Sequence, residues 1–302
     1  MFPTLKKFHI TPLLLTCIVL AVLLVVQYTI REGMTDQPNP KFRQLTGDAI
    51  FTPQYVSMYD TLFRVQEKDK FEVEQLVKYA EMGSDSHILD LGCTTGHRTA
   101  LLQKITANVK GVDSSANMIK KAKQQYPSLD LVTDNILESS KLINHRLYTH
   151  ITVLYFEVYR HKDKHRLFRI LNGMLAPGGK LAVHLVDRNK FDPIVPAANP
   201  IHSVSPQDYA NKRLTRSEVR FNTCSYVASF EEPLQGDNYT FVETITPKDD
   251  GKPIQNRHAL HMPLQKDVLA VARDAGFTIV GRFSLDPVRY YHNQVYILQK
   301  AQ

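Results

Sequence analysis

Short apolar runs alternate with amphipathic stretches through most of the chain, and this alternation predicts an α/β fold. The stretches between the runs are mostly of helical length. Strands that alternate with helices form a parallel sheet with helices on both faces, joined by right-handed crossovers. The pattern therefore predicts a doubly wound, mostly parallel seven-stranded sheet, whose first five strands are residues 87–91, 108–113, 129–134, 150–156 and 179–187.

Two helices precede this sheet, and a different pattern interrupts it. Residues 51–66 and 70–82 carry apolar side chains at helical spacing. Residues 189–263 instead alternate in the manner of strands, with the turn signals "QGDN" and "KDDGK" between them, which predicts an antiparallel β insertion after the fifth strand. The sheet is predicted to resume with a helix over 265–277 and strands over 277–285 and 289–300.

A long apolar run lies near the start of the chain. Residues 10–30, "ITPLLLTCIVLAVLLVVQYTI", contain no acidic or basic side chain, and as a helix this run would measure about 31 Å, enough to cross a membrane. We predict a membrane anchor over residues 1–31, a polar stalk over 32–46 and a folded domain over 47–302. A cleaved signal peptide is the alternative, but no A-x-A-like cleavage site follows the run.

Charge and cysteine content exclude some classes of function. The formal net charge is +7, but the basic residues are spread along the chain, so a nucleic-acid partner is not favoured. The cysteines, Cys17, Cys93 and Cys224, form neither a disulfide framework nor a CxxC metal site. We predict no metal site, because the histidine pairs in "HKDKH" and "HALH" lack a matched cysteine or acidic cluster.

The turn after the first strand carries the most specific signal. "HILDLGCTTGHRT", residues 87–99, ends a strand at the sheet edge where ligands of open α/β sheets bind. Gly92 would allow a sharp turn, and Gly96 would let the next helix pack close to the strand. The second strand ends at Asp113, whose carboxylate can accept hydrogen bonds from both hydroxyls of a ribose. The sequence therefore predicts a site for an adenosine cofactor.

NAD and S-adenosylmethionine both contain adenosine, and the glycine spacing separates them. A dinucleotide turn needs G-x-G-x-x-G, but Thr94 stands at the middle glycine position. Asp90 would repel a pyrophosphate but can pair with the ammonium group of a methionine moiety. S-adenosylmethionine is thus favoured, and an NAD-dependent oxidoreductase is the weaker alternative. Thr94 is expected to fit the turn if its φ is negative.

Residues 87–187 resemble the class I S-adenosylmethionine-dependent methyltransferases, which have a Rossmann-like fold. "ILDLGCTTGHRT", "VKGVDSSANMI" and "DLVTDNIL" resemble the first three motifs of that family, and "ITVLYFEVYR" with "LNGMLAPGGKLAVHLVD" resembles the fourth. The resemblance implies that Asp113 binds the ribose and Asp134 the adenine amino group. The cofactor contacts that it implies are Asp90, Gly92, Cys93, Thr94, Gly96, Asp113, Ser114, Met118, Asp134, Asn135 and Leu154. No "DPPY" or "NPPY" follows the fourth strand, which argues against methylation of nucleic-acid bases.

Methyl transfer is an in-line displacement, so the protein must align donor and acceptor, exclude water and, where needed, remove a proton. Similar small-molecule and sugar amine N-methyltransferases place a substrate-covering β-region where residues 189–263 lie. The catalytic candidates are His184, His258 and Tyr155. His184 also fits the sheet interior, and Tyr226 and Glu243 are expected to be ordinary strand residues.

The sequence thus predicts a membrane-anchored methyltransferase that uses S-adenosylmethionine to methylate a small-molecule or amine-bearing acceptor. Its predicted location is a single-pass membrane protein, with residues 10–30 in the membrane; cofactor supply favours a domain facing the cytosol. The alternative from another class is a membrane-tethered scaffold that keeps the fold without turnover. Asp90 and Asp113 argue against it, because a scaffold needs no paired carboxylates at a cleft. The sequence predicts no oligomeric state.

Overall fold

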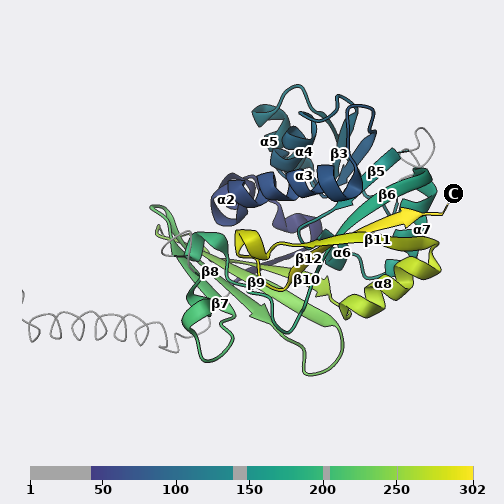
Figure 1. Ribbon diagram of the computed structural model, residues 1–302. Helices are drawn as coiled ribbons and strands as arrows, with labels where there is room; N and C mark the ends of the chain where they lie inside the picture. Colours follow the sequence, from purple (N-terminus) through teal and green to yellow (C-terminus); the bar gives the residue numbers. More distant parts are fainter. Residues whose placement is uncertain (1–41, 139–147, 200–204, 250, 302) are drawn as a thin grey trace, which may run out of the picture. The chain divides into compact units, whose positions relative to one another are not determined.

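Two β-sheets organise the chain (Figure 1). The computed structural model describes residues 42–138, 148–199, 205–249 and 251–301. From Phe42 onward the chain forms one unit. The larger sheet has the strand order β11-β12-β6-β5-β2-β3-β4. Its strands are β2 (Ile88–Leu91), β3 (Val109–Asp113), β4 (Asp130–Thr133), β5 (Tyr148–Val153), β6 (Leu175–Val186), β11 (Phe277–Ser284) and β12 (Asn293–Lys300).

Parallel pairing holds the sheet together from β4 to β6, and antiparallel pairing adds β12 and then β11 at the other edge. The strand order reverses direction between β2 and β5, which is where open α/β sheets bind ligands. The predicted doubly wound, mostly parallel, seven-stranded sheet is therefore confirmed as a mixed Rossmann-like sheet.

Helices cover both faces of this sheet. Leu76 of α3 and Leu102 of α4 pack on one face, where Ile119 of α5 also meets the sheet through β4. Leu167 of α7 and Val268 of α8 pack on the other face. Their bounds are α3 (Gln66–Ala80), α4 (His97–Leu102), α5 (Ala116–Gln125), α7 (Lys164–Met174) and α8 (Gln265–Asp274); a short α6 (Glu157–Arg160) follows β5.

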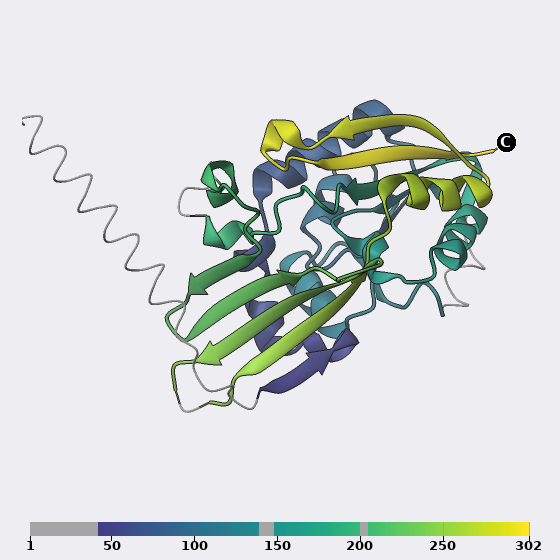
Figure 2. The same ribbon diagram turned by 90° about the horizontal axis from the view of Figure 1, so that it is seen from below.

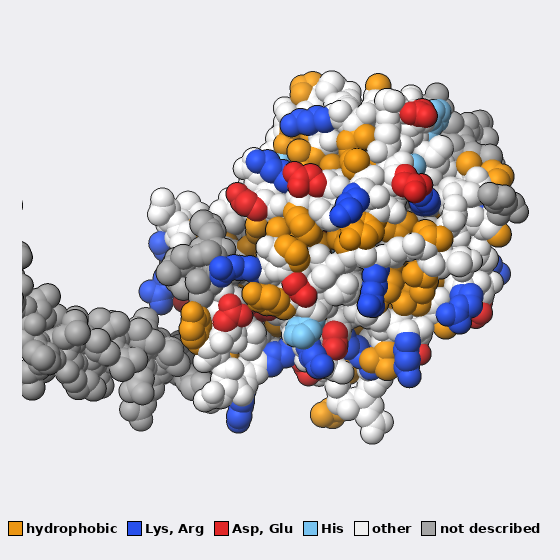
Figure 3. All heavy atoms as spheres, viewed as in Figure 1, with side chains coloured by type: hydrophobic (Ala, Val, Ile, Leu, Met, Phe, Trp, Pro, Cys, Tyr) orange, Lys and Arg blue, Asp and Glu red, His pale blue; other side chains and the backbone are white. Residues whose placement is uncertain are grey.

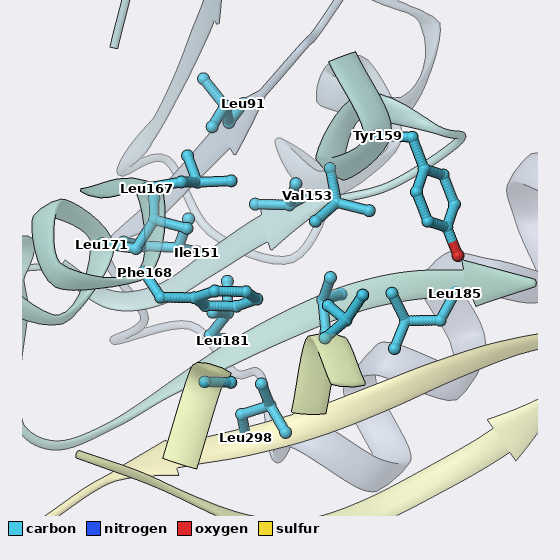
Figure 4. Close-up of a cluster of buried hydrophobic side chains, with 14 of the residues drawn as sticks. Leu91, Ile151, Val153, Tyr159, Leu167, Phe168, Leu171, Leu181, Leu185 and Leu298 are labelled. Carbon is cyan, nitrogen blue, oxygen red and sulfur yellow. The ribbon is translucent and has the colours of Figure 1, made fainter. Parts of the chain in front are cut away.

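The main core lies between the sheet and helices α7 and α8. Figure 4 shows Phe168 and Leu171 of α7 directed toward Ile151, Leu181 and Leu298 of the strands. All five side chains are at most 1% exposed. Buried apolar area of this kind contributes roughly 1.5–3 kcal/mol per side chain, so these contacts fix α7 against β5 and β6.

The predicted insertion forms the second sheet, in the order β1-β10-β9-β8-β7 (Figure 2). Its strands β7 (Arg216–Arg220), β8 (Cys224–Glu231), β9 (Asn238–Pro247) and β10 (Ile254–His261) are antiparallel, as predicted. The fifth strand, β1 (Arg43–Thr46), pairs in parallel with β10. The last residues of the predicted stalk are therefore a strand, since pairing with β10 supplies the backbone partners that local sequence could not reveal.

Helix α2 (Pro53–Phe63) packs against the second sheet and α5. Tyr55 and Val56 pack against Tyr226 and Ile245 of the insertion, and Met118 of α5 completes this cluster. Short 3₁₀ helices connect the remaining parts: η1 (Gly47–Ile50), η2 (Pro196–Ala198), η3 (Pro206–Tyr209) and η4 (Asp286–Val288). On the face shown in Figure 3, lysine and arginine side chains are interspersed with acidic ones.

The prediction of a single-pass membrane protein is corrected by this structure. Within residues 42–138, 148–199, 205–249 and 251–301, the helices are too short or too polar to cross a membrane. The predicted anchor, residues 1–31, and its membrane-contacting run, residues 10–30, lie outside the described residues.

Close packing of β3 against its neighbours gives a test of the fold. A Cβ atom on Gly111 would lie 2.6 Å from Leu131 Cδ2 and 3.1 Å from Cys93 Sγ, so we expect Gly111→Ala to lower the free energy of unfolding by about 1–3 kcal/mol. Gly173 of α7 has open space around it, so Gly173→Ala should raise that free energy by roughly 0.5–1 kcal/mol. Urea denaturation measures both, and equal effects would contradict the packing.

Candidate functional site

A cavity of about 600 Å³ opens at the carboxyl ends of β2, β3, β4 and β5. The turn after β2 forms its floor, and the walls include α2, η1 and strand β10 of the second sheet. Nine of the residues predicted from the sequence line it: Gly92, Cys93, Thr94, Asp113, Ser114, Asp134, Asn135, Tyr155 and His258. The structure places Asp90, Gly96, Met118, Leu154 and His184 elsewhere in the described fold.

Hydrogen bonds to neighbouring groups hold the turn after β2. The amides of Gly92 and Cys93 both donate to the carbonyl oxygen of Val112, at 2.8 and 3.0 Å, and the Gly96 amide donates to the Cys93 carbonyl at 2.9 Å. The amides of Cys93 and Gly96 are thus engaged inside the protein. Gly92 has φ +71°, and Gly96, at +82°, lies so close to α5 that a Cβ there would meet Ala122 at 3.2 Å.

Thr94 adopts the left-handed backbone conformation, with φ +49°. The condition under which Thr94 was expected to fit the turn, a negative φ, is therefore not met. A β-branched side chain is strained in this region by roughly 1–3 kcal/mol, and the turn keeps the glycine-like conformation although the residue is threonine. Its amide donates to Asp113 Oδ2 at 3.0 Å, which helps to hold it there.

Asp113 joins this turn to the start of α5. Its Oδ2 accepts the Thr94 amide and its Oδ1 accepts the Ser115 amide, at 2.9 Å. Burial, together with the nearby charge of Glu157, raises the pKa of the Asp113 carboxyl to about 6. Each carboxylate oxygen has a second lone pair, so Asp113 can still accept hydrogen bonds from a ligand in the cavity.

Asp90 has no access to the cavity. It is fully buried; Thr99 Oγ1 donates to its Oδ2 at 2.7 Å and Thr152 Oγ1 donates to its Oδ1 at 2.8 Å. The Nε atom of Arg98 lies 3.7 Å from Oδ1. The Asp90 carboxylate therefore ties β2 to β5 and α4.

Glu157 lies over the turn, in the position that was predicted for Asp90. A Cβ atom on Gly92 would lie 2.8 Å from Glu157 Oε2, so this carboxylate lies directly on the glycine backbone. His161 Nε2 lies 2.9 Å from Oε1, and Arg160 Nε lies 3.7 Å from Oε2. Burial would raise the pKa of Glu157, but the His161 hydrogen bond and the nearby cations hold it below its usual range. Sequence reasoning missed Glu157, although an acid soon after a strand end was a usable signal.

A second, smaller cavity of about 110 Å³ adjoins the first. Tyr59, Phe63, Tyr155, Arg160 and His258 line both cavities. Aromatic and aliphatic side chains form most of the remaining wall, including Phe156, Phe191, Phe230, Phe241 and Leu260. The small cavity therefore suits an apolar part of a ligand.

The junction of the two cavities is a strained stretch of backbone. Tyr155 and Phe156 follow β5 with φ of +48° and +63°, a conformation that is costly for aromatic residues. Lys68 Nζ lies 5.1 Å from the centre of the Tyr155 ring and donates to Glu72 at 2.7 Å. Such strain collects where a site needs a fixed geometry.

His184 lies inside the sheet and outside both cavities. Its Nε2 is 2.9 Å from Asn293 Oδ1, and the Phe156 amide donates to its Nδ1 across 3.4 Å. Burial lowers the pKa of His184 to about 4. His184 is thus a neutral residue of the sheet interior with both ring nitrogens in hydrogen bonds, which was the alternative to its predicted catalytic role.

His258 belongs to a buried polar network centred on Glu243. His258 Nε2 lies 2.6 Å from Glu243 Oε2, and Tyr55 and Tyr226 donate to Glu243 Oε1 at 2.9 and 2.6 Å. Tyr226 and Glu243, expected to be ordinary strand residues, are thus the support of His258. Cross-strand pairing explains the miss, because β8, β9 and β10 bring these residues together from separate parts of the chain.

Asp60 of α2 fastens the first helix to the turn. It accepts hydrogen bonds from Thr95 Oγ1 at 2.6 Å and Gln125 Nε2 at 3.1 Å, and it pairs with His97 and Lys121. Burial would raise the pKa of Asp60, but these four partners hold it well below its usual range. No motif or spacing in the sequence indicated this contact.

The remaining predicted residues divide between the cavity wall and its support. Ser114 donates to Asp48 of η1 at 3.0 Å, and Asn135 Oδ1 accepts the Leu137 amide at 3.1 Å, both at the wall. The Asp134 amide donates to the Asp113 carbonyl at 3.0 Å. Met118 and Leu154, both at most 1% exposed, support the wall from behind.

Comparisons with known proteins agree with this geometry. Residues 88–179 match the family model described as "Methyltransferase domain". The trans-aconitate 2-methyltransferase of Rhodopseudomonas palustris (strain BisA53) is 31% identical over 126 residues, which cover 39% of this chain and 48% of that protein. The chain thus spans about half the length of the curated relatives that it matches.

Solved methyltransferases share the fold over a longer stretch. An S-adenosylmethionine-dependent methyltransferase from Clostridium acetobutylicum has a TM-score of 0.61 at 16% identity and covers 82% of this chain and 98% of that one. CalS10 from Micromonospora echinaspora, an amino pentose methyltransferase solved with S-adenosylmethionine bound, has a TM-score of 0.58 at 15% identity and covers 82% and 97%. Residues 88–179 therefore match a methyltransferase domain, the larger sheet has the fold of solved methyltransferases, and the predicted cofactor, S-adenosylmethionine, is confirmed.

The strain at Thr94 can be measured. Since glycine adopts positive φ without cost, we expect Thr94→Gly to raise the free energy of unfolding by about 1 kcal/mol. Thr94→Ala keeps a Cβ atom in the same conformation and should regain less than half of that amount. Thermal or urea denaturation measures both variants; a glycine variant no more stable than the alanine variant would show that Thr94 is unstrained.

Proposed function

We propose that this protein is an S-adenosylmethionine-dependent methyltransferase that acts on a small-molecule acceptor. The observation that carries the proposal is the pair of adjoining cavities, one floored by the Gly92 turn and Asp113 and the other walled by aromatic side chains. The first has room for the cofactor, and the second can hold an apolar part of an acceptor beside it.

The residues of the larger cavity fit the chemical groups of S-adenosylmethionine. Asp113 ends the strand next to the turn and retains lone pairs for the ribose hydroxyls. Gly92 leaves room above the turn that a Cβ atom would fill. Ser114, Asp134 and Asn135 line the side of the cavity assigned to adenine.

We assign the ammonium group of the cofactor's methionine part to Glu157. Its Oε2 lies over Gly92, whereas both oxygens of Asp90 are occupied by threonine hydroxyls away from the cavity. A carboxylate favours a cationic ligand by a charge-assisted hydrogen bond. The ligand would also reduce the repulsion between Glu157 and Asp113.

The proposed catalysis is alignment in a site that excludes water. When bound, S-adenosylmethionine supplies an electrophilic methyl group carried on a sulfonium. Tyr59, Tyr155 and His258, which line both cavities, would orient the acceptor toward that group. His184 has no part in this proposal, because both of its nitrogens are engaged inside the sheet.

The named acceptors of similar proteins fall into two chemical groups. The curated relatives are named for trans-aconitate, and CalS10 is described as an amino pentose methyltransferase. A small-molecule acceptor, with an amine acceptor among the candidates, is the substrate class that we propose. A scaffold that keeps the fold without turnover is the second candidate, and the binding experiment below separates the two.

Calorimetric titration of the full chain with S-adenosylmethionine tests the proposal. We expect saturable binding of S-adenosylmethionine and none of NAD, because the Thr94 turn lacks the dinucleotide glycine pattern. Asp113→Ala should weaken binding about 10- to 100-fold through loss of charged hydrogen bonds to the ribose. Absence of binding by the wild-type chain would favour the scaffold, and full affinity in Asp113→Ala would contradict the assignment of Asp113 to the ribose.

The raised pKa of Asp113 predicts a pH dependence of that affinity. Asp113 ionises as the pH rises through about 6, and the ionised form accepts both ribose hydroxyls. Affinity should therefore fall, by up to about tenfold, when the pH is lowered from 7 to 5. Titrations across this range check it, and Asp113→Asn should bind weakly with little pH dependence. A wild-type affinity that rises at pH 5 would contradict the assignment.

Glu157→Gln tests the ammonium contact without a change of side-chain shape. It should weaken binding of S-adenosylmethionine and of S-adenosylhomocysteine alike, by about tenfold, since both carry the ammonium group. Glu74→Gln, on the exposed side of α3, removes the same charge and should bind normally.

Asp90→Asn should lower the free energy of unfolding by about 1–3 kcal/mol. If Asp90→Asn loses affinity in its folded fraction while Glu157→Gln does not, the assignment is reversed.

A further inference from the structure

The Glu243 network lies at the junction of the two cavities and has features of a proton-accepting group. Glu243 is fully buried in β9. Its carboxylate forms hydrogen bonds with Tyr55 of α2, Tyr226 of β8 and His258 of β10. Asn256 Nδ2 lies 3.5 Å from its Oε2. Side chains from two strands and one helix thus surround a single carboxylate. Burying this charge costs desolvation free energy that apolar side chains in the same place would not.

Glu243 is the ionised member of this network. Burial alone would raise the pKa of its carboxyl, but the contact with His258 and the hydroxyl donors of Tyr226 and Tyr55 hold that pKa below its usual range. Burial and the charge of Glu243 raise the pKa of both tyrosines well above the usual value, so they stay neutral donors. A carboxylate with only donors around it takes the proton-bearing nitrogen of His258 as its partner.

This arrangement fixes the tautomer of His258. Nε2, at 2.6 Å from Glu243 Oε2, carries the proton, so Nδ1 of the neutral ring has the free lone pair. Nδ1 makes no hydrogen bond within the described parts of the chain. His258 is only 6% exposed overall, yet it lines both cavities. A base that is dry, oriented and next to the two ligand spaces meets the geometric requirements of general base catalysis.

Aromatic rings surround the imidazole of His258. Rings of Phe51, Tyr55 and Phe241 lie with their centres about 6 Å from the imidazole, at 6.3, 6.3 and 5.9 Å. The cation that shares both cavities with it is Arg160 of α6, whose guanidinium lies 5.5 Å from the Phe51 ring centre. The acid that faces it directly is Glu243.

We propose that His258, positioned by Glu243, accepts a proton from the methyl acceptor, and that the acceptor is therefore an amine or hydroxyl compound and not a carboxylate. This inference rests on the proposed function and names the substrate class of the same site. The acceptor's nitrogen or oxygen lone pair forms the new bond to the methyl carbon, and the carbon–sulfur bond breaks with its electron pair on sulfur. The acceptor's N–H or O–H proton moves to His258 Nδ1, and the imidazolium, stabilised by Glu243, later releases it to water.

The pair of His258 and Glu243 distinguishes between classes of acceptor, because only some acceptors have a proton to lose. A carboxylate is already deprotonated at neutral pH and needs no base, so a buried and oriented histidine would contribute nothing to its methylation. An amine or hydroxyl compound carries a proton that has to leave. Glu243 acts through His258 alone in this proposal, as a positioning residue that sets the tautomer and stabilises the imidazolium.

Nitrogen NMR of histidine-labelled full-length protein tests the tautomer without knowledge of the natural acceptor. We expect the His258 signals, assigned by their loss in His258→Asn, to show a protonated Nε2 and a bare Nδ1. With S-adenosylhomocysteine present, benzylamine and benzyl alcohol should shift the Nδ1 signal, and phenylacetate should leave it unchanged. His184 is the internal control, because it lies outside both cavities. A protonated Nδ1 on the neutral ring, or a response to phenylacetate alone, would overturn the proposal.

Methyl transfer to the same three probes gives the second readout. The amine or the alcohol should be methylated, and His258→Asn should lower kcat about 10²- to 10⁴-fold with little change in KM. Glu243→Gln should lower kcat with a changed pH profile, whereas Glu218→Gln, which removes an exposed carboxylate of β7 outside this network, should leave activity unchanged. Methylation of phenylacetate that persists in His258→Asn would refute the base. Wild-type protein that binds no S-adenosylmethionine would instead refute the proposed function itself, so the two failures are distinguishable.

Discussion

The carboxylate of Asp113 is the contact on which the site depends. One of its oxygens holds the amide of Thr94 and the other holds the amide of Ser115, so a single side chain fixes the turn after β2 and the start of α5. The hydrogen bond to the Thr94 amide helps to offset the strain of that residue's left-handed backbone. The same carboxylate lines the cavity, where burial and the nearby charge of Glu157 raise its pKa. Local structure and ligand affinity are thus set by the same group.

Periodicity along the chain was sufficient to predict the framework. Every strand of the larger sheet and the antiparallel insertion are where the alternation of apolar runs placed them, because those signals depend on neighbouring residues. Strand β1 was missed, since residues 43–46 owe their extended form to pairing with β10, more than 200 positions away. A contact of that range leaves no trace in a short stretch of sequence.

The sequence predicted the location of the site better than the side chains that form it. The motif turn located the cavity, and Gly92 and Asp113 line it as expected. The sequence motif does not show which way a carboxylate points. Two threonine hydroxyls hold Asp90 inside the sheet, and Glu157 lies over the turn instead. Glu243 was taken as an ordinary strand residue because its partners come from three other elements. Side-chain hydrogen bonds across elements decide such roles, and they exist only in the folded chain.

The wall that the two cavities share has a thermodynamic consequence. Because Tyr59, Tyr155 and His258 each face both spaces, a molecule that restrains these side chains from one cavity changes the affinity of the other cavity. Linkage requires this effect to be reciprocal, so the factor by which the first ligand strengthens the second equals the factor by which the second strengthens the first. The coupling between two bound ligands would then be a property of the five side chains that the cavities share, and not of either cavity taken separately.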